Sequence, residues 1–322
     1  MEQRRLGRSG LTVGRLGLGT MTWGRDTDEH EAADQLSMFL DAGGTLLDTA
    51  AGYGDGESER VIGGLLGSKV DREEVVLATK AGISRRTGER VVNTSRKALL
   101  DALDGSLRRL GTDHVDLWQV HAWSDDTALE ETLGAVDAAV SSGRTRYAGI
   151  SNYSGWQTGR AVTWQAAWPG RAPIVSTQVE YSLLQRGVER EVIPAAQALG
   201  LGVLPWSPLG AGVLTGKYRS GTPADSRAAS PHFARFIERF LDDRSRRIVD
   251  AVATAADGLD VTPLEVALAW VRDAPAVTAP ILGARTAAQL KTSLDADALT
   301  LPVEIRQALD EVSAPPTGYP DR

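Results

Sequence analysis

The feature that most constrains the fold is the regular alternation of short β-rich runs with amphipathic stretches. Between the runs, apolar residues such as Leu129, Leu133, Val136 and Val140 recur at spacings of three and four, the period of one helix face. Strands that alternate with helices favour a parallel sheet, and eight strands close a (β/α)₈ barrel. The eight candidate strands are RLGLG (15–19), TLLD (45–48), VVLATK (75–80), VDLWQV (115–120), RYAGIS (146–151), IVSTQV (174–179), GVLPWS (202–207) and VTAPIL (277–282).

Two helices have recognisable ends. Asp126 or Thr127 is expected to cap the helix that contains Leu129, and Gly143 to close it. A second helix, with its apolar face between Leu99 and Leu110, should end at Gly111.

An open doubly wound sheet is the alternative to a barrel. Such sheets usually bind dinucleotides through G-x-G-x-x-G after the first strand. Here Gly17 and Gly19 follow that pattern, but Thr22 stands at its last position. The segment GAGVLTGKY (210–218) resembles a phosphate loop, yet has Ala in place of the first glycine and Tyr in place of the final Ser or Thr. Neither nucleotide motif is complete.

The composition shows no sharp change, which predicts a single barrel domain over residues 1–322. Ahead of the first barrel strand, RRLGRSGLTVGR forms two short runs around Ser9 and Gly10, which predicts a hairpin that we expect to cover the bottom of the barrel. The longest connection spans 208–244, and a loop of that length in a compact domain is usually functional or mobile.

Charge and cysteine content exclude several classes of protein. The net charge is −7, without a long run of like charges, which argues against a nucleic-acid or membrane-surface partner. There are no cysteines, and therefore no disulfides, thiolate nucleophiles or Cys-ligated zinc; four scattered histidines make a catalytic zinc improbable. No window approaches the roughly 20 apolar residues of a membrane span. We expect a cytoplasmic protein without a metal, as a monomer or a homo-oligomer.

Polar residues gather where the predicted strands end. Asp48, Lys80 and His121 end or follow three consecutive strands, and Tyr53 stands in the loop after the first of these. Later strands lead to Ser151, Asn152, Gln178, Trp206 and Ser207. Since barrel active sites lie at the C-terminal ends of strands, one cleft should collect these side chains.

These residue types suit proton transfer to an oxygen. Free tyrosine has a pKa near ~10 and is a poor proton donor at neutral pH. A nearby lysine ammonium should lower that pKa, a carboxylate should keep the lysine charged, and a neutral histidine can orient a carbonyl oxygen. No side chain supplies a hydride, so carbonyl reduction would require a nicotinamide.

Seven segments, in order along nearly the whole chain, resemble the aldo-keto reductases of microbial type. They are LLDTAAGYGDGES, VVLATKAG, DLWQVHAW, YAGISNYS, STQVEYSLLQR, VLPWSPLGAGVLTGK and PILGARTAAQL. The resemblance implies a (β/α)₈ barrel that binds NADP(H) without a Rossmann fold, in agreement with the missing glycine motif.

The resemblance also implies roles for individual residues. The catalytic tetrad falls on Asp48, Tyr53, Lys80 and His121, with Tyr53 as the proton donor. Cofactor-binding roles fall on three groups: Ser151, Asn152 and Gln178 at the carboxamide with Trp206 stacked on the nicotinamide; Ser207, Leu209 and Lys217 along the pyrophosphate; and Gly283, Arg285 and Gln289 at the 2′-phosphate. The pair Thr292 and Ser293 departs from the family's usual Glu-Asn, which leaves the adenine contacts undefined.

The substrate pocket is expected to include Trp23 and Trp123, because each follows a strand end. The leading functional prediction is an NADPH-dependent carbonyl reductase or alcohol dehydrogenase acting on a small-molecule carbonyl compound. Two alternatives are a Schiff-base enzyme that uses Lys80 as nucleophile, and a non-enzymatic cofactor-sensing subunit on the same fold.

Overall fold

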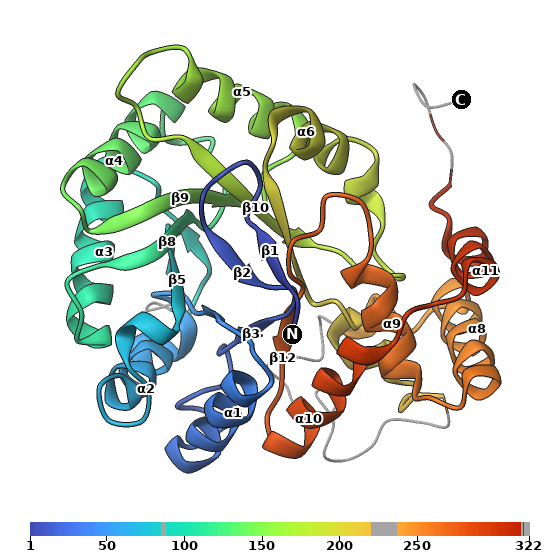
Figure 1. Cartoon of the computed structure of the whole chain (residues 1–322). Helices are drawn as coiled ribbons and strands as arrows, with labels where there is room; N and C mark the ends of the chain where they lie inside the picture. The colour runs from blue at the N-terminus through green and yellow to red at the C-terminus, as the bar shows by residue number, and fades with distance from the viewer. Residues whose placement is uncertain (85–87, 220–236, 317, 319–322) are drawn as a thin grey trace.

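Eight parallel strands form the central sheet in a computed structural model of the chain, which describes residues 1–84, 88–219, 237–316 and 318 (Figure 1). In sheet order the strands are β11 (Gly202–Trp206), β10 (Ile174–Glu180), β9 (Thr145–Ser151), β8 (Val115–Val120), β5 (Val76–Ala81), β4 (Leu46–Asp48), β3 (Gly17–Gly19) and β12 (Ile281–Gly283).

The segment that leads into β12 pairs with β11 and closes the sheet. A parallel bridge joins Val203 to Val277, with Val203 N donating to Ala276 O at 3.1 Å and Thr278 N donating to Val203 O at 2.8 Å. The prediction of a (β/α)₈ barrel is therefore confirmed, and the open doubly wound alternative is excluded.

Helices follow the strands and form the outer ring in Figure 1. They are α1 (Glu29–Asp41), α2 (Glu57–Leu65), α3 (Arg96–Leu110), α4 (Leu129–Ser141), α5 (Gly155–Ala166), α6 (Val192–Leu199), α8 (Asp243–Leu259), α9 (Pro263–Arg272), α10 (Ala287–Asp295) and α11 (Val303–Ser313). Each of the first six follows one barrel strand, α8 and α9 follow β11, and α10 follows β12.

The apolar core has two parts, divided by the barrel wall. Successive side chains of a strand point to opposite faces. On β4, Leu46 belongs to the cluster inside the barrel, and Leu47 to the cluster between strands and helices. Because of this alternation, the residue after Leu47 points back into the barrel.

The N-terminal hairpin is present as predicted. Strand β1 (Gln3–Arg5) pairs antiparallel with β2 (Thr12–Gly14), and the hairpin lies across the middle of the strand ring in Figure 1. Leu6 and Val13 are fully buried in the cluster inside the barrel, so the hairpin closes one end of it. Gly7 has a φ of +60°, and a Cβ there would lie 2.5 Å from the carbonyl oxygen of Gly200.

Several predicted boundaries need correction. The Ser95 side chain accepts from Ala98 N at the start of α3, and Gly111 ends that helix with a φ of 64°, as expected at this position. Helix α4, however, begins after Ala128 without a side-chain cap, so the prediction of Asp126 or Thr127 as the cap is wrong. Strand β12 begins only at Ile281, directly after Pro280, which has no N–H to pair.

In the described part of the chain, every helix is too short or too polar to cross a membrane. The predicted functional loop 208–244 is described only in part, because residues 220–236 lie outside the described ranges.

Candidate active site

The alternation along the strands brings three predicted catalytic residues to the same face. On β4 and β5, Leu46 and Ala78 lie in the cluster inside the barrel, and Asp48 and Lys80 come two residues later. On β8, Leu117 lies inside the barrel and His121 comes four residues later. All three side chains therefore lie above the apolar filling of the barrel, at the C-terminal end of its strands.

Asp48 and Lys80 form a buried ion pair. Lys80 Nζ donates to Asp48 Oδ2 at 2.7 Å and to the carbonyl oxygen of Thr49 at 2.8 Å. The Lys80 side chain has no exposed surface, and that of Asp48 is only 3% exposed. The second oxygen of Asp48 accepts from Gln178 Nε2 at 2.9 Å. The carboxylate is thus held from two sides and fixes the position of the lysine ammonium.

Tyr53 reaches this pair from the loop after β4. Lys80 Nζ lies 3.5 Å from the Tyr53 hydroxyl oxygen, to which it donates, and 5.1 Å from the ring centroid. The chain then turns through three consecutive left-handed residues, Gly54, Asp55 and Gly56, with φ of 55°, 54° and 96°. Such backbone favours glycine, so the glycines beside Tyr53 allow the turn that leads from the phenol into α2.

The pKa of Tyr53 differs from the sequence-based expectation. Burial raises it, and the Lys80 ammonium, which lowers it, does not offset that effect. Burial is the largest cause of the raised pKa, and the charge of Asp48 adds a smaller effect in the same direction. For Lys80, burial lowers the pKa, but Asp48 and Tyr53 outweigh burial, and the net pKa is raised. At neutral pH the site therefore holds a protonated phenol beside a charged lysine.

His121 faces the phenol from β8. Its ring centroid lies 6.1 Å from that of Tyr53, with the two rings at 79° to each other. Its backbone N donates to Ala81 O at 2.8 Å, and its carbonyl oxygen accepts from Asn152 Nδ2 at 3.0 Å. The four predicted catalytic residues are thus brought together.

A buried network behind the barrel wall supports this arrangement. Glu59, on α2, is fully buried and accepts from Thr79 Oγ1 at 2.6 Å and from Arg109 Nε at 2.8 Å. Ser58 Oγ donates to Thr20 O at 2.8 Å and lies 3.0 Å from Thr49 Oγ1. These bonds attach the first turn of α2, directly after the Tyr53 loop, to strand β5 and to the residues that directly follow β3 and β4.

A cleft of about 1050 Å³ opens above these residues. Asp48, Tyr53 and His121 line it, with Lys80 beneath them. All ten predicted cofactor residues line it as well: Ser151, Asn152, Gln178, Trp206, Ser207, Leu209, Lys217, Gly283, Arg285 and Gln289. Residues far apart in the sequence therefore share one cavity.

The inner part of the cleft offers amide and hydroxyl groups. Gln178 uses its Nε2 on Asp48, which leaves its Oε1 for a ligand. Ser151 is buried and receives a bond from Asn152 Nδ2 at 3.0 Å. Asn152 Oδ1 accepts from the indole Nε1 of Trp206 at 3.0 Å. A planar carboxamide would find both donors and acceptors here.

The outer part of the cleft offers positive charge and a helix N-terminus. Lys217 and Arg285 both line it. Thr286 caps α10 by accepting from Gln289 N, and Arg285 N donates to Gln289 Oε1 at 3.0 Å. A guanidinium beside a helix N-terminus is suited to bind an anion. Thr292 and Ser293 line the same cleft one turn further along α10.

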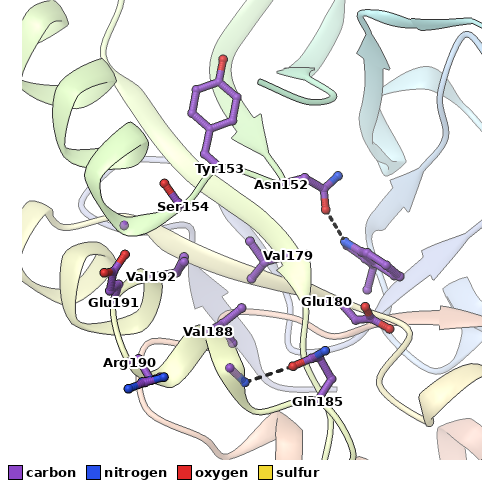
Figure 2. A pocket seen from close by; sticks show the side chains of 13 residues that line it. Asn152, Tyr153, Ser154, Val179, Glu180, Gln185, Val188, Arg190, Glu191 and Val192 are labelled. Atoms are coloured by element: carbon purple, nitrogen blue, oxygen red, sulfur yellow. Dashed lines mark hydrogen bonds between the residues drawn. The ribbon is translucent and has the colours of Figure 1, made fainter. Parts of the chain in front are cut away.

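A second, more open hollow of about 710 Å³ adjoins the cleft, and Figure 2 shows its lining. Val179, Val188 and Val192 provide apolar surface, and Glu180 and Arg190 add charge. Asn152 and Trp206 line both cavities.

The prediction that Trp23 and Trp123 line the substrate pocket needs correction. Trp23 has no exposed surface, and its indole Nε1 donates to Gln35 Oε1 at 3.1 Å, so it belongs to the core. Trp123 packs edge-to-face on Tyr153 and Trp156 and does not line the cleft. A position after a strand does not determine where the side chain points.

Other residues that line the cleft were missed by the sequence analysis. Met21 and Thr22 lie two and three residues after the end of β3, and a search of the loops that follow strand ends would have found them. Six further residues also line the cleft: Arg25, Asp55, Ile83, Arg90, Ile237 and Arg239. No cluster of His, Asp or Glu that could hold a metal occurs in the described part of the chain.

Comparison with known proteins identifies related sequences over the whole chain. A model of the aldo/keto reductase family matches residues 15–314. The chain is 37% identical to an uncharacterized oxidoreductase, YrpG, of Bacillus subtilis, with 99% of this chain and 98% of the relative covered. It is 35% identical to a probable voltage-gated potassium channel subunit beta of Oryza sativa subsp. japonica (100% and 98% covered). It is 32% identical to an L-glyceraldehyde 3-phosphate reductase of Escherichia coli (92% and 87% covered).

Proposed function

The chain belongs to the aldo/keto reductase family, and from this premise we propose that it is an oxidoreductase that uses NADPH to reduce an aldehyde or ketone to the alcohol. Tyr53 would donate the proton. The substrate would be a small carbonyl compound bound in the mouth of the cleft, beside Tyr53 and His121.

One observation carries this proposal. A protonated phenol lies at the floor of a large cleft, and its hydroxyl is 3.5 Å from a lysine that a buried carboxylate keeps charged. A general acid must be protonated and within reach of the oxygen that receives the proton. Tyr53 meets the first condition at neutral pH, and its position in the cleft supports the second.

In carbonyl reduction, each of the four residues at the inner end of the cleft would have its own role. A nicotinamide bound in the cleft would supply the hydride that the carbonyl carbon accepts. Tyr53 donates its proton to the carbonyl oxygen as negative charge develops there, and the Lys80 ammonium stabilises the resulting phenolate. Asp48 holds Lys80 in place, and His121 orients the carbonyl oxygen towards the phenol.

The cleft has the groups that the cofactor would need. Ser151 and the free Oε1 of Gln178 suit its carboxamide, and the Trp206 indole offers a surface for stacking. Ser207, Leu209 and Lys217 suit its pyrophosphate. The preference for NADPH rests on Arg285, with Gly283 and Gln289, because a guanidinium beside this helix N-terminus suits a 2′-phosphate, which NADH lacks.

The test is oxidation of NADPH by the purified protein across a panel of aldehydes, ketones and sugars. Turnover with at least one substrate class, and tighter binding of NADPH than of NADH in a fluorescence titration, are the expected results. A protein that binds NADPH but reduces no member of the panel would contradict the assignment as a reductase.

The structure argues against a Schiff-base mechanism. A nucleophilic lysine needs a lowered pKa, whereas the pKa of Lys80 is raised by Asp48 and Tyr53 despite burial. Borohydride in the presence of an aldehyde should therefore trap no adduct on Lys80, and a trapped adduct would reverse this conclusion.

A cofactor-sensing subunit remains the second candidate, and the plant relatives named as channel beta subunits favour it. Both candidates predict NADPH binding. Only the reductase predicts multiple turnovers, so the substrate panel separates them.

A further inference from the structure

We infer that Glu59 is a positioning residue for the proposed reaction: through the Thr79 hydroxyl behind the barrel wall, it sets the distance between the Tyr53 phenol and the Lys80 ammonium. The inference rests on the proposed function for its effect on catalysis. The link itself is a property of the free chain and can be measured without a substrate.

The first observation is where the Glu59 carboxylate binds. Its Oε1 accepts from Thr79 Oγ1 at 2.6 Å, and Thr79 directly precedes Lys80 on β5. Because side chains alternate across a strand, Thr79 points towards the helices and Lys80 into the barrel. Ser58, the preceding residue of α2, is bonded instead to Thr49 directly after β4, with 3.0 Å between the two hydroxyl oxygens. Glu59 therefore provides a bond from α2 to the strand that carries the lysine.

The second observation is that Tyr53 stands in a turn and not on a strand. Gly54, Asp55 and Gly56 follow it with left-handed φ values, which interrupt regular helical bonding until α2 begins. Lys80 Nζ donates to the Tyr53 hydroxyl at 3.5 Å, which is longer than the usual ~3 Å of such a bond. A small displacement of α2 would therefore break this contact, and a bond that anchors the first turn of α2 opposes that displacement.

The third observation is that the Glu59 carboxylate is itself held in place. It is fully buried, and a buried carboxylate needs a partner of opposite charge. Arg109, on α3, supplies this charge, with Nε at 2.8 Å and Nη2 at 2.6 Å from Glu59 Oε2. The arginine also packs against the end of the Tyr53 turn, since a Cβ at Gly56 would lie 2.7 Å from Arg109 Cδ and from its Nε. Because Oε2 binds Arg109 and Oε1 binds Thr79, the ion pair fixes the orientation of the carboxylate towards β5.

The link can be measured in the free protein through the ¹³Cζ resonances of its six tyrosines. Tyr53→Phe identifies the Tyr53 resonance by its loss. The bond is best broken at Thr79, because removing Glu59 would leave the charge of Arg109 without its partner. Thr79→Val removes the hydroxyl and keeps the branched shape, and it should move the Tyr53 resonance. Thr79→Ser keeps the hydroxyl and should leave the resonance in place.

The matched control is Thr132→Val, which removes a buried hydroxyl on α4 that donates to a backbone carbonyl oxygen at 3.0 Å. This change should lower the melting temperature and leave the Tyr53 resonance in place. A Tyr53 resonance that does not move in Thr79→Val, or that moves equally in Thr132→Val, would overturn the inference, whatever the cofactor does.

The consequence for catalysis is tested by single-turnover hydride transfer at saturating NADPH, well below the melting temperature. Because a displacement of about 1 Å can cost about 10²-fold, we expect Thr79→Val to slow transfer about tenfold while the Kd for NADPH changes less than about twofold. Thr79→Ser should restore most of the rate, and Thr132→Val should keep it. A wild-type rate in Thr79→Val, or a loss that Thr79→Ser does not recover, would contradict the positioning role.

A double variant shows whether Thr79 acts through Tyr53. In the Tyr53→Phe background, Thr79→Val should have little further effect on the rate, because residues that act on one interaction give non-additive losses. Losses that multiply would show that Thr79 acts independently of the phenol and would overturn the inference. If Thr79→Val did not fold, Thr79→Ala removes the same hydroxyl and carries the same expectations. If the wild type reduced no substrate, the proposed function would fail, while the Tyr53 resonance would still decide the link.

Discussion

The two ends of the cleft are built in different ways. The inner end (Asp48, Tyr53, Lys80 and His121) rests on three neighbouring barrel strands, and its ion pair is buried. The outer end comes from the connection after β11 (Lys217), the last residue of β12 (Gly283), and the turn into α10 with its first helical turn (Arg285 and Gln289). Gly283 and Gln289 are exposed there.

Because the two ends of the cleft are built differently, we expect the inner end to govern the chemical step and the outer end to govern the choice of cofactor. Strand ends that are hydrogen-bonded on both sides hold side chains more rigidly than exposed connections do. A change at the inner end should therefore alter the rate of the chemical step. A change at the outer end should alter which cofactor binds, and how tightly, with little effect on that step.

The largest expected effect is that of Tyr53→Phe, which removes only the hydroxyl of the proton donor. Loss of a general acid typically costs about 10²–10⁴-fold, and we expect the upper part of this range for kcat/KM. Tyr153→Phe is the matched control, because Tyr153 is also buried but does not line the cleft. Comparable losses in the two variants would indicate a general effect of removing a buried hydroxyl.

Lys80→Met should be nearly as severe and should change the pH dependence. Tyr53 donates only while protonated, and burial raises its pKa. In the wild type, the rate of reduction should therefore stay level through neutral pH and fall only above about pH 10, the ordinary value for tyrosine. Without the ammonium that opposes this rise, the Tyr53 pKa should increase further, and the alkaline fall should move to still higher pH.

Single-turnover rates measured against pH test this prediction. Removing one partner of a buried ion pair destabilises a protein by about 3–5 kcal/mol, so Lys80→Met should be compared with the double variant that also carries Asp48→Asn. Restored thermal stability with persistent loss of activity is the expected outcome. An alkaline limb that moves to lower pH in Lys80→Met would refute the role given to Lys80.

A smaller effect, confined to binding, is expected for Arg285→Ala. Hydrogen bonds to charged groups contribute about 1.5–3 kcal/mol, so the Kd for NADPH should rise by about 10- to 150-fold, and that for NADH should change much less. The control is Lys291→Ala on the same helix, which pairs with Asp295 and does not line the cleft. Equal losses for both cofactors would remove Arg285 from the 2′-phosphate site.

The smallest effect is expected for Trp123→Ala. Trp123 packs on Tyr153 and Trp156, outside the cleft. The change should lower the melting temperature and leave KM within about twofold of the wild type for small and bulky aldehydes alike, since packed aromatic pairs contribute to the stability of the fold. A KM that rises only for bulky aldehydes would restore Trp123 to the substrate pocket.

The sequence predicted the inner end of the cleft well, for a physical reason. The alternation of side chains along a strand is a local property, so the residue two positions after an inward Leu46 or Ala78 must also point inward. The position of Asp48 and Lys80 follows from that period, whereas Tyr53 lies in the loop after β4, and the catalytic roles were implied by the family resemblance. The ends of strands beside proline were predicted less accurately. Strand β12, predicted over 277–282, spans only Ile281–Gly283.

What the sequence did not predict depends on loop conformation and on burial. The direction of Trp23 is decided by its hydrogen bond to Gln35, twelve residues away on α1. The raised pKa of Tyr53 depends mainly on how deeply the phenol is buried, which outweighs the opposing charge of Lys80. Neither the loop conformation nor the burial of the phenol can be read from the spacing of residues in the sequence.

The contrast between the two ends is tested most directly by measuring two quantities, the Kd for NADPH and the single-turnover rate of hydride transfer at saturating NADPH, in Tyr53→Phe and in Arg285→Ala. The account predicts opposite patterns. Tyr53→Phe should bind NADPH normally and transfer hydride at least about 10²-fold more slowly, while Arg285→Ala should bind weakly and transfer at the wild-type rate. A Tyr53→Phe enzyme that binds NADPH normally and reduces its best aldehyde at a near wild-type rate would contradict the account.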